Sequence, residues 1–179
     1  MIEAIVLAAG LSSRMGAKNK LLLPLRGKAI LQQTVEALLD AQIERVIVES
    51  GHEHENYQKG QLTSIQKGLS QLSDSCEAFL VCLSDMPLLT TVGYNALLDI
   101  NQATYIGEPI IVPYNGTRAG NPKLFDSHYK KEILSLNTSE HQGAKEILRT
   151  HKDKVLYHSS NHLGFFFDID TPSAYQKLL

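Results

Sequence analysis

The sequence predicts a three-layer α/β/α fold of the Rossmann-like type, with a mainly parallel sheet between two helical layers. Three observations support this prediction. Short apolar runs typical of buried strands alternate with segments in which apolar residues recur at helical spacing. The 179 residues are enough to bury a core of this kind. No repeat, low-complexity tract or Pro/Ser-rich linker divides the chain, so we expect one domain spanning residues 1–179.

The first half of the chain contains three apolar runs that predict strands. They cover residues 3–7, 45–49 and 78–83. Apolar residues at helical spacing predict a helix at 30–39, and a second helix that begins at a Thr63 cap and carries Ile65, Leu69 and Leu72.

The second half predicts two strands and four helices. The strands are expected at 109–112, with Pro109 at the edge of that strand, and at 165–169. The helices are expected at 94–100, 132–136 and 144–148, and from Pro172 onward with Thr171 as N-cap. Open sheets of this type bind ligands beyond the carboxyl ends of their strands. The residues best suited to chemistry do follow predicted strands.

Composition excludes several classes of protein. Apolar residues make up 43% of the chain, charged residues 20%, and the net charge is −2, which predicts no general nucleic-acid or membrane surface. No apolar run approaches the roughly 18 residues of a membrane span. The first residues lack the basic segment of a signal peptide, so we expect a cytoplasmic protein. Cys76 and Cys82 make no disulfide framework, and Cys82, in an apolar run, is expected to be a buried thiol.

A basic, glycine-containing loop follows the first strand. No acidic residue occurs between Glu3 and Glu36, which predicts a small anionic ligand, although a solvated basic loop would also fit the charges alone. Small residues at 8–10 allow a ligand to approach the backbone, and two serines offer hydroxyls. The spacing matches neither a Walker A loop nor Gly-x-Gly-x-x-Gly. The basic residues of this window are Arg14, Lys18, Lys20, Arg26 and Lys28.

Carboxylates follow two predicted strands. Asp85 comes after the strand at 78–83 and could hold Mg²⁺, or it could be a turn aspartate before Pro87. Asp168 and Asp170 stand two apart on a predicted strand and would face the same side. Asp168 is the preferred second metal ligand. Asp170 either assists it or leads into the last helix.

Two further features are weaker. The run His52-Glu53-His54-Glu55 lacks the spacing of a zinc motif and is interpreted as a solvated turn. Arg118 could meet the phosphate of a substrate, or it could be a surface arginine.

Taken in chain order, these motifs resemble those of the MobA-like nucleotidyltransferases, and the resemblance covers almost the whole chain. The matching segments are 7–16, 19–24, 60–65, 68–69, 83–87, 120–125, 143–145 and 168–172. Within the family, the pair Ala8-Ala9 and the sequence Asp-Ile-Asp-Thr-Pro are most similar to the molybdenum cofactor cytidylyltransferases. The guanylyltransferase relatives more often carry two glycines in place of Ala8-Ala9.

The resemblance implies a Mg²⁺-dependent transfer of CMP from CTP to a small phosphorylated acceptor such as molybdopterin, with release of pyrophosphate. The implied catalytic residues are Arg14, Lys20 and Asp85, and the implied metal ligands are Asp85, Asp168 and Asp170. The implied nucleotide contacts are Leu7, Ala8, Ala9, Gly10, Ser12, Ser13, Gly16, Thr63, Ser64, Gly68 and Asn121.

Two alternatives stay open beside this reading. One is a nucleotidyltransferase for another small phosphate, such as a sugar 1-phosphate. The other is a non-catalytic nucleotide- or pterin-binding maturation factor for a molybdenum hydroxylase. A transiently bound molybdoenzyme is the expected protein partner of the cytidylyltransferase and of this maturation factor. One departure from the family pattern concerns residues 50–59, where members usually fit another helix and strand, so we expect a sheet with room for one strand fewer.

Overall fold

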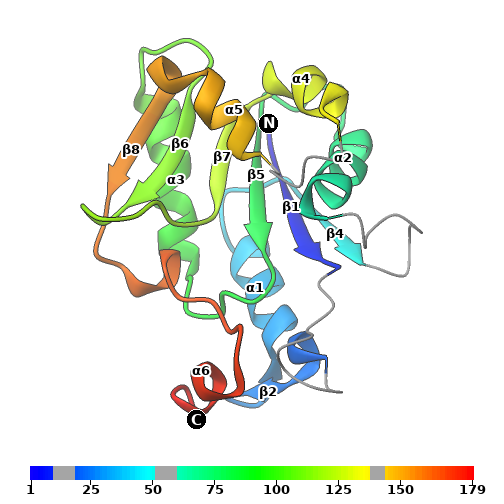
Figure 1. Ribbon diagram of the computed structural model, residues 1–179, viewed down its shortest axis with the longest axis vertical. Coiled ribbons are helices and arrows are strands. Elements are labelled where there is room, and N and C mark those ends of the chain that lie inside the picture. Colours follow the sequence, from blue (N-terminus) through cyan, green and yellow to red (C-terminus); the bar gives the residue numbers. More distant parts are fainter. Residues whose placement is uncertain (10–18, 51–59, 138–143) are drawn as a thin grey trace.

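A six-stranded sheet forms the centre of the molecule in the computed structural model, which describes residues 1–9, 19–50, 60–137 and 144–179 (Figure 1). The strand order is β4-β1-β5-β7-β6-β8. β7 is antiparallel to both of its neighbours, and the other neighbouring pairs are parallel, which confirms a mainly parallel sheet. The strands are β1 (Ile2–Ala8), β4 (Arg45–Ser50), β5 (Ala78–Leu83), β6 (Ile110–Tyr114), β7 (Lys123–Asp126) and β8 (Val155–Ser159).

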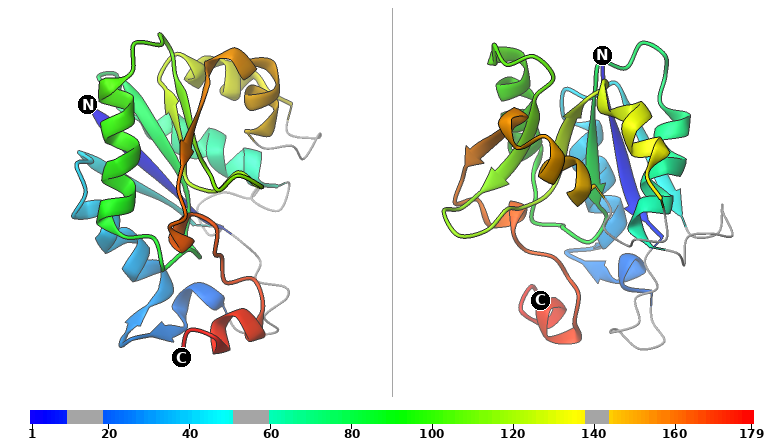
Figure 2. Two further views of the ribbon diagram at one scale, coloured as in Figure 1. Left: turned by 90° about the vertical axis from the view of Figure 1, so that its left-hand side faces the viewer. Right: turned by 45° about the horizontal axis from the view of Figure 1, so that its top comes forward.

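Helices cover both faces of the sheet, which confirms the three-layer architecture (Figure 2). One face packs against α2 (Gln61–Gln71), α4 (Tyr129–Ser135) and α5 (Lys145–Thr150). The opposite face packs against α1 (Ile30–Leu39) and α3 (Thr91–Ala103). The central strands β1 and β5 can be covered on both faces because their residues are mostly buried and apolar on both sides.

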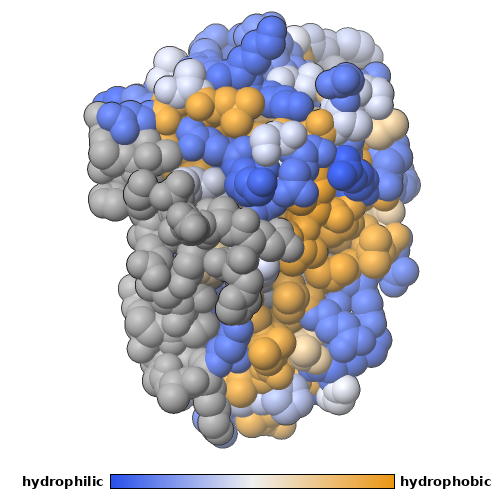
Figure 3. Space-filling view, turned by 90° about the vertical axis from the view of Figure 1, so that its right-hand side faces the viewer, coloured by the Kyte–Doolittle hydropathy of each residue, from blue (hydrophilic) through white to orange (hydrophobic). Residues whose placement is uncertain are grey.

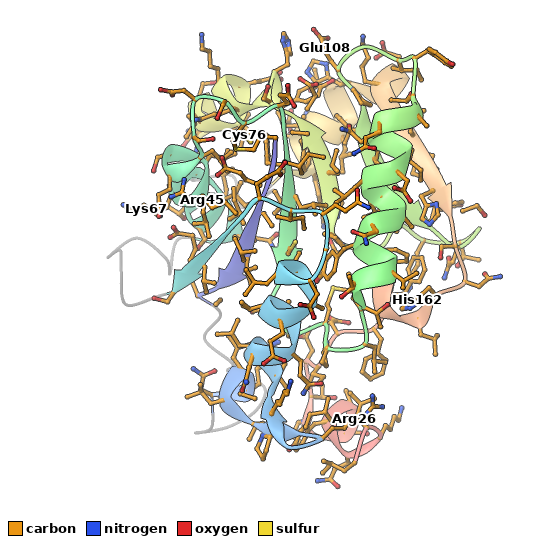
Figure 4. The ribbon with its side chains drawn as sticks, turned by 180° about the vertical axis from the view of Figure 1, so that it is seen from behind. Arg26, Arg45, Lys67, Cys76, Glu108 and His162 are labelled. Carbon is orange, nitrogen blue, oxygen red and sulfur yellow. The ribbon has the colours of Figure 1, made fainter. Side chains whose placement is uncertain are left out.

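A small unit lies beyond the carboxyl ends of β1 and β5, at the bottom of Figure 1. Its hairpin joins β2 (Pro24–Leu25) to β3 (Lys28–Ala29) through Arg26 and Gly27, whose φ values of 53° and 84° are those of a two-residue hairpin turn. The last helix, α6 (Pro172–Gln176), packs beside this hairpin, near the labelled Arg26 (Figure 4). The unit therefore places the C-terminal helix at the carboxyl end of the sheet.

The predicted strand at 165–169 is wrong. Residues Leu163–Phe165 form a short 3-10 turn, and the chain that follows is irregular. Its backbone bonds to loop residues and not to a neighbouring strand. The Phe165 carbonyl accepts from the N–H of Asn121 at 2.9 Å, and the N–H of Ile169 donates to the Asp85 carbonyl at 3.0 Å. The helix from Pro172, capped by the Thr171 side chain, is confirmed.

The predicted Thr63 cap is also wrong. Helix α2 begins at Gln61, after Gly60 with φ 119°, and the Thr63 hydroxyl donates to the Gly60 carbonyl inside the first turn. Short strands β7 and β8 were not predicted, because neither has a distinct apolar run. The histidine turn and the shortened segment both fall in 51–59, outside the described residues.

The two ends of the sheet differ in character. Arg45 and Cys76, labelled in Figure 4, lie toward the amino ends of the strands, where Arg45 contacts the buried Glu3 carboxylate at 3.5 Å.

On the side that bears β4 and α2, apolar surface lies directly beside polar surface (Figure 3). Within the described ranges, no helix is both long and apolar enough to cross a membrane.

Candidate active site

Three carboxylates meet at the carboxyl end of β5. One oxygen of each of Asp85, Asp168 and Asp170 lies within 4.8 Å of the others. Ile169, between the two C-terminal aspartates, is fully buried among Leu25 and Ile30. Its flanking aspartates therefore face the opposite side, toward Asp85, although the segment is not a strand. The predicted grouping is found, for a different structural reason than expected.

Lys20 bridges two of these carboxylates. It starts a short 3-10 turn, Lys20–Leu22, which the Asn19 side chain caps. Its Nζ donates to Asp85 Oδ2 at 2.5 Å and to Asp170 Oδ1 at 2.7 Å, and only 11% of its side chain is exposed. Burial lowers the pKa of Lys20, but the hydrogen bonds to Asp170 and Asp85 outweigh burial, so the net pKa is raised. The site thus holds a fixed positive charge at neutral pH.

The charge of the cluster suits a further cation. Oδ1 of Asp85 is buried and has no hydrogen-bond partner. Burial, together with the negative charges of Asp170 and Asp85, raises the pKa of Asp168. Both observations indicate carboxylate charge that Lys20 does not neutralise. Three carboxylate donors, with no nitrogen or sulfur ligand grouped with them among the described residues, suit a hard divalent cation such as Mg²⁺ or Mn²⁺.

The end of β1 is tied to the start of this cluster. Ser84, buried just before Asp85, donates to the Leu7 carbonyl at 2.7 Å, and its own carbonyl accepts from Thr34 at 3.3 Å. These bonds hold the chain that leaves β1 at Ala8 and Ala9 beside the aspartate turn. Ser84 received no predicted role, and its position beside Asp85 is the signal that could have revealed one.

The predicted nucleotide contacts fall in two groups. Leu7 and Ala8 end β1 at this site and Ala9 follows them, whereas Gly10, Ser12, Ser13, Arg14 and Gly16 lie outside the described residues. In α2, Thr63 and Ser64 occupy the first turn, and Ser64 is buried.

Gly68 lies farther along α2. A Cβ atom there would stand 2.4 Å from the Cγ2 atom of Ile5, so close helix–strand packing accounts for this glycine. Its role as a nucleotide contact stays a prediction.

Asn121 lies between two cavities. A cavity of about 200 Å³ extends from Asn121 to Asp168 and Arg118. Arg118 donates to the Phe166 carbonyl at 2.5 Å, and its guanidinium carbon lies 5.8 Å from the centroid of that ring, so it is held at the rim. A second cavity, of about 160 Å³, contains two lysines, Lys123 and Lys145. Both lie in segments that resemble the family, the first in the loop at 120–125 that resembles its acceptor side, but neither was singled out as a site residue.

A larger cavity, of about 400 Å³, lies at the opposite end of the sheet, beside Met1, Ile2 and Glu44. It is at the amino ends of the strands, where open α/β sheets do not place their ligands. The candidate site therefore lies around the three aspartates.

The family model for the MobA-like NTP transferase domain matches residues 4–155. The chain belongs to this family. The curated relatives include the bifunctional protein GlmU of Geobacillus sp. (strain WCH70), 28% identical over 84% of this chain and 36% of GlmU. The molybdenum cofactor guanylyltransferase of Shewanella sp. (strain MR-4) is 30% identical over 63% of this chain and 47% of that protein. The chain thus spans less than half the length of these two relatives.

Other relatives match along nearly their whole length, among them a probable molybdenum cofactor guanylyltransferase of Natranaerobius thermophilus, 26% identical over 98% of this chain and 94% of that protein. The purine catabolism protein PucB of Bacillus subtilis is 26% identical over 97% of this chain and 94% of PucB. Among solved structures, a nucleotidyl transferase from Methanothermobacter has a TM-score of 0.77 at 19% identity, over 99% of this chain and 95% of that chain. Rv0371c of Mycobacterium tuberculosis in complex with manganese has a TM-score of 0.74 at 20% identity, over 99% and 97%. At such low identity these structures show that the fold is shared.

Proposed function

We propose that this member of the MobA-like family is a nucleotidyltransferase that uses a divalent cation. It transfers the nucleotidyl part of a nucleoside triphosphate to a small phosphorylated acceptor and releases pyrophosphate. The observation that carries the proposal is the meeting of Lys20 with Asp85, Asp168 and Asp170 directly beyond β1 and β5. Polyphosphate chemistry needs this combination of a fixed cation and a metal-ligating carboxylate group.

The reaction asks little covalent work of the protein. A phosphate oxygen of the acceptor forms a bond to the α-phosphorus, and the bond from that phosphorus to the pyrophosphate oxygen breaks. The attacking phosphate is already ionised at neutral pH, so no general base is required. Lys20 would stabilise the charge that grows on the departing pyrophosphate. Arg14, Ser12 and Ser13 are proposed to hold the same phosphates, and Ala8 to Gly10 to contact the base and ribose.

A divalent cation would be held by Asp85, Asp168 and Asp170, and Mg²⁺ is our proposal. When bound, such an ion supplies charge neutralisation and orients phosphate oxygens. The buried, unpartnered oxygen of Asp85 supports this assignment. The manganese complex of a protein of the same fold is consistent with it.

The finer proposal is CTP as the nucleotide and molybdopterin as the acceptor. The choice of CTP rests on the sequence alone, chiefly on the Ala8-Ala9 pair. The choice of acceptor rests on relatives named for the molybdenum cofactor, although those relatives are guanylyltransferases. In this reading the protein acts in the cytosol, where its two free, buried cysteines stay reduced, and hands its product to a molybdoenzyme.

Two alternatives to this proposal remain. A solved structure of the same fold, a putative glucose-1-phosphate thymidylyltransferase of Bacillus anthracis, favours trying a sugar 1-phosphate as acceptor. The PucB relative is named for a pathway and not for a reaction, so a non-catalytic maturation role is the second alternative.

The test is release of pyrophosphate by the purified protein with Mg²⁺, using CTP, GTP, ATP or UTP against molybdopterin or glucose 1-phosphate. We expect the highest rate with CTP and molybdopterin. Release with a sugar 1-phosphate alone would move the assignment to the first alternative. Nucleotide binding without release from any pair would favour the non-catalytic role.

A further inference from the structure

The cavity of about 160 Å³ beside Asn121 combines an apolar floor with two cations. It lies between the start of α2, the carboxyl half of β5, the first residue of β7 and the start of α5. Apolar side chains that belong to the main core form the floor: Ile65, Val81, Leu83 and Phe125. Gln61, Asn121, Lys123 and Lys145 supply the polar part of the wall.

Lys123 is a cation whose side chain lies against the apolar residues of the main core. It lies directly opposite Val81 in the β5–β7 ladder, so its side chain leaves the sheet on the face that Val81 packs into the core. Its Nζ donates to Asn121 Oδ1 at 2.6 Å and to the Gly120 carbonyl at 3.4 Å, both of them uncharged acceptors. No carboxylate of the described residues pairs with it. Burial, and then the charge of Lys145, lowers the pKa of Lys123 to about 8.

Further positive potential comes from the neighbouring elements. Lys145 is the first residue of α5, it is exposed, and no carboxylate among the described residues forms an ion pair with it. The amino end of α2 reaches the same cavity through Gln61, and the N-terminus of an eleven-residue helix carries a partial positive charge. Like charges gathered around a partly desolvated cavity are unfavourable unless an anion joins them. The arrangement therefore indicates a binding site for an anionic group.

The size and position of the cavity define the ligand further. A dry protein cavity of roughly 150 Å³ accommodates a benzene ring, so this one could take a ring-sized apolar group. Asn121 also lines the neighbouring cavity that reaches Asp168. A molecule whose reacting phosphate lies at the aspartates could thus extend past Asn121 toward the two lysines.

We propose that the cavity bounded by Lys123 and Lys145 binds the far end of the acceptor, through an anionic group carried on a ring-sized, partly apolar body. The identity of the occupant rests on the proposed function, whereas the binding chemistry rests on the cavity alone. Lys123 and Lys145 would then select acceptors that bear a second negative charge, distinct from the phosphate that reacts.

The cavity can be tested without nucleotide, metal or turnover. We would titrate the methyl-labelled protein with phenylphosphonate, benzoate and uncharged benzyl alcohol, and follow the methyl NMR signals of Ile65, Val81 and Leu83. We expect phenylphosphonate or benzoate to shift these signals and benzyl alcohol to bind about tenfold more weakly or worse, because it lacks the charge-assisted hydrogen bonds. The stronger of the two anions tells whether the far group is a phosphate or a carboxylate.

Lys123→Met and Lys145→Met provide the decisive comparison, with Lys152→Met, an exposed lysine that does not line the cavity, as the matched control. Each cavity variant should weaken binding of the better anion by about tenfold, and the control should leave it unchanged. Methyl signals that do not respond to either anion, or variants that bind as wild type does, would overturn the proposal. Lys145 is on the surface, so its variant tests binding independently of any change in core packing or stability at Lys123.

CTP binding in the same variants separates this inference from the nucleotide site. We expect the dissociation constant for CTP to be unchanged in Lys123→Met and Lys145→Met. An equal loss of CTP and anion affinity would assign the lysines to the nucleotide phosphates and overturn the proposal. A protein that binds the anion but transfers no nucleotide would refute the proposed function only. A protein that transfers nucleotide but binds no anion would refute this inference only.

Discussion

Lys20 donates a hydrogen bond of 2.5 Å to Asp85, a residue 65 positions later in the chain, at the carboxyl edge of the sheet. Its ammonium group also contacts Asp170 at 2.7 Å, so it occupies carboxylate oxygens that a divalent cation would use. Lysine and metal are therefore expected to compete while no nucleotide is bound, and the phosphates would draw Lys20 away from the aspartates.

This relationship predicts opposite effects of one substitution on binding and on turnover. In Lys20→Met, Mn²⁺ should bind more tightly without nucleotide, by about fivefold or more, because a competing charge is removed. Nucleotidyl transfer should fall by about a hundredfold or more, because the departing pyrophosphate loses a cation. Electron paramagnetic resonance of free Mn²⁺ measures the first effect. Weaker Mn²⁺ binding in this variant would show that Lys20 supports the metal site instead of competing with it.

Lys123 predicts a pH-dependent cost in stability. Its pKa falls from 10.5 to about 8 on folding, because burial and Lys145 disfavour its charge. Between these values the unfolded chain binds more protons, so wild-type stability should rise as pH increases from 8 to 10.5. Below pH 8 the cost is fully present.

Lys123→Met should therefore stabilise the protein at pH 7, by about 1–2 kcal/mol after the loss of two neutral hydrogen bonds. The gain should largely disappear at pH 10. Urea unfolding at both pH values gives the two differences in free energy. An equal gain at pH 7 and pH 10 would mean that charge is not its cause.

Gly68 predicts a packing defect without a binding defect. Gly68→Ala places a methyl group 2.4 Å from Ile5 Cγ2, which we expect to cost about 1–3 kcal/mol of unfolding free energy. Gly107→Ala is the matched control, since a Cβ atom there meets nothing within 4 Å. If Gly68 acts only through packing, the CTP dissociation constant stays unchanged. A large loss of CTP affinity in a stably folded variant would restore the nucleotide role that the sequence predicts for it.

The sequence predicts local structure well where a single apolar pattern decides it. β1, β5 and α1 follow from runs whose residues are apolar on both faces or at helical spacing. The apolar run from Phe165 to Phe167 predicts a strand by the same pattern, but no strand forms there. Apolar side chains can also anchor an irregular segment, and the backbone of this one bonds to Asn121 and Asp85.

The candidate site was only partly predictable for a related reason. Asp85, Asp168 and Asp170 stand out in the sequence, but their meeting depends on the burial of Ile169 and on a contact between chain segments far apart. Lys123 gives no motif by itself. Its importance follows only from its place opposite Val81, and a strand register of this kind is fixed by tertiary structure.

Asp85 provides the most direct test of the account as a whole, because it is proposed to hold the metal and it bonds to Lys20. The measurement is a single-turnover reaction with CTP radiolabelled at the α-phosphate, excess enzyme, Mg²⁺ and molybdopterin, comparing wild type with Asp85→Asn. We predict that the label moves to the acceptor with wild type, and that the rate drops by about a hundredfold or more with Asp85→Asn. Transfer by Asp85→Asn at the wild-type rate, with the variant folded, would contradict the central claim that this aspartate cluster carries the reaction.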